Sequence, residues 1–107
     1  MKVFISVPIE QSNVGFAVER ARTMKRKVVR KGHECVTQFE ASPGIADCPK
    51  HVGDNVAELL RCDALFLLSG WAAYMPCAVC WEVAQLYGKK IFTNINQIPG
   101  PKDNEED

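Results

Sequence analysis

Four short apolar runs, separated by segments with helical periodicity, constrain the fold of this chain more than any other feature. Short runs of this kind, bounded by turn residues, are typical of strands that are buried on both faces of a parallel sheet. We predict strands at residues 2–7, 33–39, 63–69 and 90–93. The segments between them predict helices from residue 12 or 13 to about 31, from about 50 to 61, and from about 76 to 87.

The alternation of strand and helix predicts the fold class. Parallel strands joined by right-handed helical crossovers place helices on both faces of one sheet. We therefore expect an α/β protein, a flavodoxin-like or Rossmann-like three-layer domain with a four- to five-stranded, mainly parallel sheet. The third helix is expected to bury an apolar stripe formed by Val79, Val83, Leu86 and Tyr87.

The length and composition fit one such domain. The 107 residues, of which 47% are hydrophobic and 24% charged, suit a single core, which we place at residues 1–98. Four of the last five residues are acidic, so residues 99–107 are expected to form a disordered acidic tail. The longest apolar runs, such as residues 64–68, are too short to cross a bilayer, and the first residues lack a signal-peptide pattern. We therefore expect a cytoplasmic protein with no membrane contact.

The charges exclude a general electrostatic attraction to nucleic acid. Thirteen basic and thirteen acidic residues give a formal net charge of zero, so nucleic acid is not an expected partner. Seven of the twelve residues from Arg20 to Lys31 are basic. This cluster suits a solvated helix surface or, alternatively, a local anion-binding face.

The cysteine, histidine and glycine patterns leave few cofactor classes open. Five cysteines cannot all pair within one chain, so we expect reduced thiols. Cys77 and Cys80 form a C-x-x-C motif at a helix start, where the helix dipole would lower the pKa of the first thiol. The motif suits packing at the helix start or, less favoured, a dithiol or metal-binding role. The two histidines lack partners at metal-ligand spacing, and no glycine-rich phosphate-binding motif follows the first strand. We expect no metal and no cofactor.

The predicted topology also indicates where a ligand would bind. In open parallel sheets, ligands bind beyond the C-terminal ends of the strands. That rule selects residues 6–10, the loop after Phe39, and residues 69–76 with the start of the third helix. Glu82, in the second turn of that helix, lies at the edge of its apolar stripe and is a candidate nucleophile or general base.

Four segments together carry a resemblance to a known family. They are Phe4-Ile5-Ser6-Val7-Pro8-Ile9, Leu59-Leu60-Arg61-Cys62-Asp63-Ala64, Leu67-Leu68-Ser69-Gly70-Trp71 and Cys77-Ala78-Val79-Cys80-Trp81-Glu82. They are similar to motifs of the nucleoside 2-deoxyribosyltransferase superfamily. The Cys-Asp-Ala strand and the Gly-Trp turn resemble its small branch of uncharacterised phage and bacterial proteins. The resemblance covers about residues 2–93.

The resemblance implies an enzyme that acts on the N-glycosidic bond of a deoxynucleoside or deoxynucleotide. In the superfamily a Glu attacks the anomeric carbon of the 2'-deoxyribosyl group, and another base or water then resolves the glycosyl-enzyme. On this chain the nucleophile would be Glu82, and Asp54 would orient it or the sugar. Counted back from Gly88 without a gap, the nucleophile position falls on Cys80 instead.

The substrate-binding residues follow from the same resemblance and from the predicted loops. The expected pocket residues are Ser6, Pro8, Ser69, Gly70, Trp71 and Tyr74. The two aromatic side chains among them would stack on a base, extend into a partner subunit or pack against their own helix. Relatives form dimers or larger assemblies, so we expect a homo-oligomer. The alternatives are a module that binds a nucleotide without cleaving it and, less favoured, a redox protein that uses Cys77 and Cys80.

Overall fold

The computed structural model describes residues 1–43 and 49–100 of the chain. Its strands are β1 (Lys2–Ser6), β2 (Glu34–Thr37), β3 (Ala64–Leu67) and β4 (Lys90–Phe92). Its α-helices are α1 (Val14–Arg30), α2 (Gln38–Ala41), α3 (Pro49–Leu60) and α4 (Met75–Leu86). Short 3₁₀ turns are η1 (Gln11–Asn13), η2 (Trp71–Ala73) and η3 (Ile95–Gln97). None of the helices in the described ranges has the length and apolar character needed to cross a membrane.

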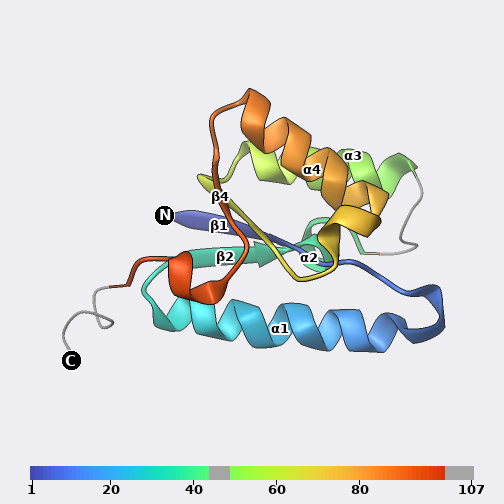
Figure 1. The fold of residues 1–107 in the computed structure, drawn as a ribbon, viewed down its shortest axis with the longest axis horizontal. Helices are drawn as coiled ribbons and strands as arrows, with labels where there is room; N and C mark the ends of the chain where they lie inside the picture. The colour runs from blue at the N-terminus through green and yellow to red at the C-terminus, as the bar shows by residue number, and fades with distance from the viewer. Residues whose placement is uncertain (44–48, 101–107) are drawn as a thin grey trace.

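The described strands form one four-stranded sheet in the order β2-β1-β3-β4. β1 pairs in parallel with β2 on one side and with β3 on the other, and β3 pairs in parallel with β4. α1 covers one face of this sheet, whereas α3 and α4 cover the opposite face (Figure 1). The predicted α/β class, with its flavodoxin-like or Rossmann-like three-layer arrangement, is confirmed.

Successive side chains of the central strands β1 and β3 point to opposite faces of the sheet, and each face forms its own hydrophobic core. In β1, Val3 and Ile5 face α1, whereas Phe4 faces α3 and α4, and none of the three side chains is exposed. β3 repeats the pattern, with Phe66 on the α1 side and Leu65 on the other side. Both faces of these strands are therefore buried, which explains why their sequences are continuously apolar.

The segment after β2 differs from the sequence prediction. The strand ends at Thr37 instead of continuing to residue 39, and the next four residues form the short helix α2. A capping box sets this boundary. The Thr37 hydroxyl accepts a hydrogen bond from Glu40 N at 3.3 Å, and Glu40 Oε1 accepts one from Thr37 N at 2.9 Å. Of the predicted loop, residues 44–48 lie outside the described residues.

The buried face of α4 also differs from the prediction. The helix buries Cys77, Cys80 and Ala84, whereas Leu86 is 78% exposed and Tyr87, just after it, is 65% exposed. The predicted apolar stripe is therefore wrong at its last two positions. Small side chains at the contact let a helix approach its neighbours closely, and here they pack α4 against β3 and α3.

After β4 the chain returns to the α1 side of the sheet. Ile98 is fully buried in the core on that side. Pro99 O accepts a hydrogen bond from His33 Nε2, and Gly100 is buried against Lys31. The first two residues of the predicted tail are thus packed on the domain, and residues 101–107 lie outside the described residues.

Leu65 and Leu86 provide a matched test of this packing. Leu65 has no exposed surface, so Leu65→Ala should lower the free energy of unfolding by about 2–5 kcal/mol. Leu86→Ala removes the same atoms from an exposed side chain and should change that free energy by less than about 0.5 kcal/mol. Urea unfolding followed by circular dichroism measures both. Equal losses in the two variants would contradict the burial of β3 and the orientation of α4.

Candidate functional site

The chain leaves the neighbouring strands β1 and β3 toward opposite edges of the sheet. β1 leads through α1 to β2 at one edge, whereas β3 leads through α4 to β4 at the other. Such a reversal of strand order opens a crevice beyond the C-terminal ends of the two strands, where α/β proteins bind ligands. A pocket of about 330 Å³ lies here, lined by residues that follow β1, residues that follow β3, and the first turns of α1.

The two loops of the predicted site meet in this pocket. Its lining includes Pro8, Ser69, Gly70 and Tyr74 from the predicted set. Gly70 has a φ of +94°, a left-handed conformation that favours glycine, and a Cβ there would lie 3.3 Å from Pro8 Cγ. Glycine at this position therefore lets the loop after β3 approach the loop after β1. Contact of these residues with a ligand stays a prediction.

α1 contributes pocket residues that the sequence analysis did not select. Arg20 Nη2 donates a hydrogen bond to Ser69 O at 3.2 Å, which ties α1 to the loop after β3. The guanidinium carbon of Arg20 lies 5.8 Å from the centroid of the Phe16 ring, within cation–π range. Phe16 is 56% exposed, so an apolar ring and a cation lie together in the pocket wall. Helical spacing was the available signal, because Asn13, Phe16 and Arg20 recur every three or four residues.

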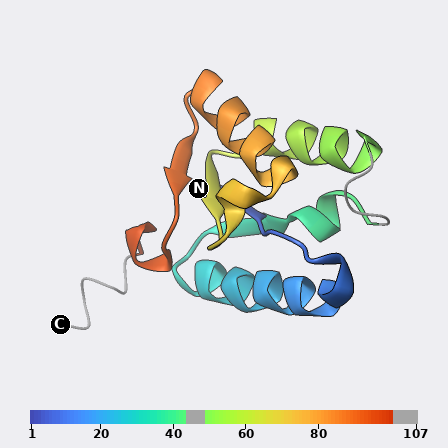
Figure 2. The ribbon, with the colours of Figure 1, turned by 45° about the vertical axis from the view of Figure 1, so that its right-hand side comes forward.

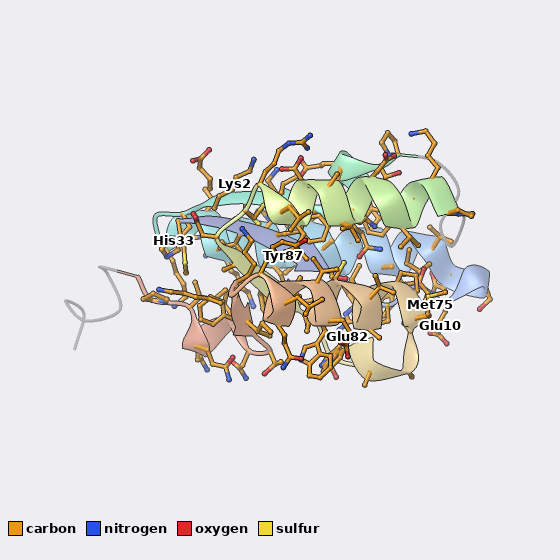
Figure 3. The ribbon with its side chains drawn as sticks, turned by 90° about the horizontal axis from the view of Figure 1, so that it is seen from above. Lys2, Glu10, His33, Met75, Glu82 and Tyr87 are labelled. Carbon is orange, nitrogen blue, oxygen red and sulfur yellow. The ribbon has the colours of Figure 1, made fainter. Side chains whose placement is uncertain are left out.

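Glu82, the predicted nucleophile, does not line this pocket. It is exposed on α4, two residues away from the buried Cys80 and Ala84. A step of two residues turns a helical side chain by about 200°, so Glu82 faces away from the core that these residues join. Figure 3 shows Glu10 and Met75 at the end of the molecule where the pocket lies, and Glu82 farther along the side of α4.

Asp54, the predicted partner of Glu82, also lies outside this pocket. Its Oδ2 accepts hydrogen bonds from Lys50 Nζ at 2.8 Å and from Ser42 Oγ at 2.9 Å. The hydrogen bond from Lys50 and, to a smaller extent, the one from Ser42 hold the pKa of the Asp54 carboxyl below its ordinary value. Asp54 is therefore an ionised carboxylate that connects α3 to the end of α2 through Ser42 and bonds to Lys50 within α3.

Ser6 and Trp71, the remaining predicted residues, are not among the pocket-lining residues either. Ser6 is buried, and its Oγ donates a hydrogen bond to Cys77 Sγ at 3.1 Å. Trp71 packs against Trp81 of α4, with ring centroids 5.7 Å apart and planes tilted by 32°. Both residues therefore connect the loops of the sheet edge to α4.

Burial dominates the chemistry of the C-x-x-C motif. It raises the pKa of Cys77 to about 11 and that of Cys80 to about 12, although the hydrogen bond with Ser6 acts in the opposite direction. The expected lowering of the first thiol's pKa by the helix dipole is thus wrong, because the cost of ionising a desolvated thiol exceeds it. Both side chains are therefore held in the protonated thiol form at neutral pH. Within residues 1–43 and 49–100, no group of three or more His, Cys, Asp or Glu side chains is placed to hold a metal ion.

Comparisons with known proteins do not assign this chain to a family. No protein-family model, curated protein or solved structure gives a significant match to the chain. The resemblance to the nucleoside 2-deoxyribosyltransferase superfamily therefore stays a prediction from sequence motifs. What the pocket binds has to be inferred from the residues that line it.

The raised thiol pKa values predict a loss of stability at alkaline pH. The folded state raises the pKa of Cys77 and Cys80 from 9.0 to about 11 and about 12. Because the folded state holds these protons more tightly, their stabilising effect is complete below pH 9 and is lost as the pH rises through 11 and 12.

The variant with both Cys77→Ala and Cys80→Ala removes these two titrations. Its free energy of unfolding should fall less than that of the unmodified protein between about pH 8 and about pH 10.5. Urea unfolding at the two pH values measures the difference, and the thiols of Cys35 and Cys62 are common to both proteins. An identical pH dependence in the two proteins would contradict the raised pKa values of Cys77 and Cys80.

Proposed function

We propose that this domain binds a nucleoside monophosphate, or a nucleotide of similar size, in the pocket between the ends of β1 and β3. The observation that carries the proposal is a cation beside aromatic side chains at a reversal of strand order. Nucleotides are recognised by this combination of an anion-binding group and a flat apolar surface. The volume of about 330 Å³ falls within the range of small-molecule sites.

Arg20 is the group that would bind the phosphate. A guanidinium is always charged and carries five N–H donors in a planar arrangement that matches phosphate oxygens. Ser69 O occupies one donor of Arg20, and the Phe16 ring lies near the guanidinium carbon. These two contacts restrict the side chain before a ligand arrives, so less conformational entropy is lost on binding.

Phe16 and Tyr74 are the groups that would contact the base. They line the pocket from two different elements, Phe16 from α1 and Tyr74 from the N-cap of α4. Aromatic side chains stack on any nucleobase, so they support affinity without selecting one base. Asn13 and Ser69 add polar groups to the same lining.

The positions of the carboxylates favour binding over cleavage. A nucleophile must reach the anomeric carbon of the bound sugar. The two carboxylates that the resemblance assigns to catalysis do not line this pocket, because Glu82 is exposed on the side of α4 and Asp54 is bonded to Ser42 and Lys50. Glu10, which does line it, is exposed to solvent and does not belong to the motifs of that resemblance. Binding without cleavage, one of the alternatives left open by the sequence, is therefore the function that this geometry supports best.

N-glycosidic cleavage is the second candidate, and the motif that ends in Glu82 favours it. An exposed carboxylate on α4 can act on a nucleotide if a second copy of the chain brings the ligand to it. This version of the proposal therefore requires the homo-oligomer that the resemblance implies. Deoxyribosyl transfer or hydrolysis would then take place at the junction between two copies.

Arg20→Gln tests the phosphate contact. It keeps a side chain that can donate hydrogen bonds but removes the charge, so affinity for deoxynucleoside monophosphates should fall by at least tenfold, or about 1.4 kcal/mol. Affinity for the unphosphorylated nucleosides should change little. Arg22→Gln is the matched control, because Arg22 does not line this pocket. Titration calorimetry with all four monophosphates measures the effect. Equal weakening in the two variants, or no binding by the unmodified protein, would refute the proposed site.

Glu82→Gln separates binding from cleavage. On the binding proposal, the unmodified protein releases no free base from a deoxynucleoside or its monophosphate, and Glu82→Gln binds these ligands as the unmodified protein does. Chromatographic detection of free base, with and without an acceptor base, provides the measurement. If the unmodified protein releases free base and Glu82→Gln abolishes this release without changing the affinity, the binding proposal is wrong. The protein would then be an N-glycosidic enzyme that uses Glu82 as its nucleophile.

A further inference from the structure

The outward face of α1 carries a row of basic side chains that the proposed pocket does not use. Arg22, Arg26 and Arg30 are exposed and follow one another at intervals of four residues. At 1.5 Å per residue, this row runs for about 12 Å along the helix. A groove of about 480 Å³ beside the row is lined by the same three residues, with Glu40 on its far side.

Most of the charge in this row is not neutralised within the described part of the chain. Arg22 lies 3.5 Å from Glu19, but both side chains are more than 60% exposed, so that ion pair is weak. Within residues 1–43 and 49–100, Arg26 and Arg30 form no ion pair, and Arg26 contacts the Thr23 hydroxyl at 3.3 Å. Glu40 is already paired with Lys25 at 2.6 Å. The row therefore presents cations that an acidic segment can bind.

The end of the described chain lies beside this helix. η3 packs near the C-terminal end of α1 in both ribbon views (Figures 1 and 2). Gly100 fits against Lys31 so closely that a Cβ on it would lie 2.9 Å from Lys31 Cβ and 3.2 Å from Lys31 O. Pro99, through its carbonyl, is bonded to His33. The segment that follows residue 100 therefore begins next to the C-terminal end of α1.

The residues that follow are acidic. Positions 101–107 contain one basic residue and four acidic ones, which are Asp103, Glu105, Glu106 and Asp107. Seven residues can extend over about 23–25 Å, which is longer than the row on α1. A tethered segment of this length is present near the row at an effective concentration in about the millimolar range. Several weak ion pairs are then sufficient for contact at low salt.

We propose that the acidic segment 103–107 binds the basic row Arg22, Arg26 and Arg30 on the outward face of α1 of the same chain. This contact covers the row with charge of opposite sign. It keeps the basic face of a chain of zero net charge from attracting other polyanions.

The first test compares the full chain with a variant in which Asp103→Asn, Glu105→Gln, Glu106→Gln and Asp107→Asn are combined. At an ionic strength of about 20 mM, the amide and Arg side-chain NMR signals of residues 22–31 should differ between the two proteins. The difference should vanish at about 0.5 M salt, because exposed ion pairs are screened. Glu34→Gln, which neutralises an exposed acid on β2, is the control and should leave these signals unchanged.

Two further experiments connect the segment to the row. Adding Arg26→Gln and Arg30→Gln to both proteins should remove the difference between them. A synthetic peptide with the sequence of residues 101–107, added to the neutralised variant, should shift the same signals, whereas the peptide with the four acids replaced by amides should not. Identical α1 signals in the first two proteins at low salt, or peptide-induced shifts confined to residues outside α1, would overturn the proposal.

Discussion

The pairing of β1 with a strand on each side is the interaction on which the rest of the structure depends. Phe4 lies opposite Val36 on β2 and opposite Leu65 on β3, so one short strand carries both central ladders. A shift of one residue in either pairing would exchange the faces of Val3 and Phe4 and expose both cores. The same two-sided pairing creates the reversal of strand order, and the pocket exists because β1 and β3 end side by side there.

The strand pattern was predictable because burial on both faces leaves a continuous apolar sequence. What failed was the interpretation of residues whose environment depends on tertiary contacts. Phe39 extended the apolar run of the second strand, and the Thr37–Glu40 capping box, which was present in the sequence, sets the boundary instead. On α4 the large Leu86 and Tyr87 suggested a buried stripe, but close packing against β3 selects small residues, and no periodicity distinguishes the two possibilities.

For the candidate site, the sequence predicted the residues that follow the strand ends but not those that α1 contributes. Pro8, Gly70 and Tyr74 follow from the rule for parallel sheets, since the backbone alone places the ends of β1 and β3 together. Arg20 was not placed in the pocket, because the basic run that begins with it was interpreted as a solvated helix surface or a local anion-binding face and was not connected to the ends of the strands. α1 in fact presents three surfaces. Ala17, Ala21 and Val28 are buried in the core, Arg20 lines the pocket, and Arg26 faces outward. Among the described elements, α1 and η3 cover this face of the sheet, so one helix supplies the core contacts, part of the pocket wall and the outward surface.

The contact between Trp71 and Trp81 gives the molecule a built-in optical signal. These are the two tryptophans of the chain, and their rings lie 5.7 Å apart with a tilt of 32°. Two indole chromophores at such a separation and angle couple their electronic transitions, and the sign and strength of the resulting circular dichroism depend on their relative orientation. Trp71 adjoins Gly70 in the pocket wall, whereas Trp81 belongs to α4. Any rearrangement of the pocket loop relative to that helix would therefore change the ellipticity of the native, unlabelled protein.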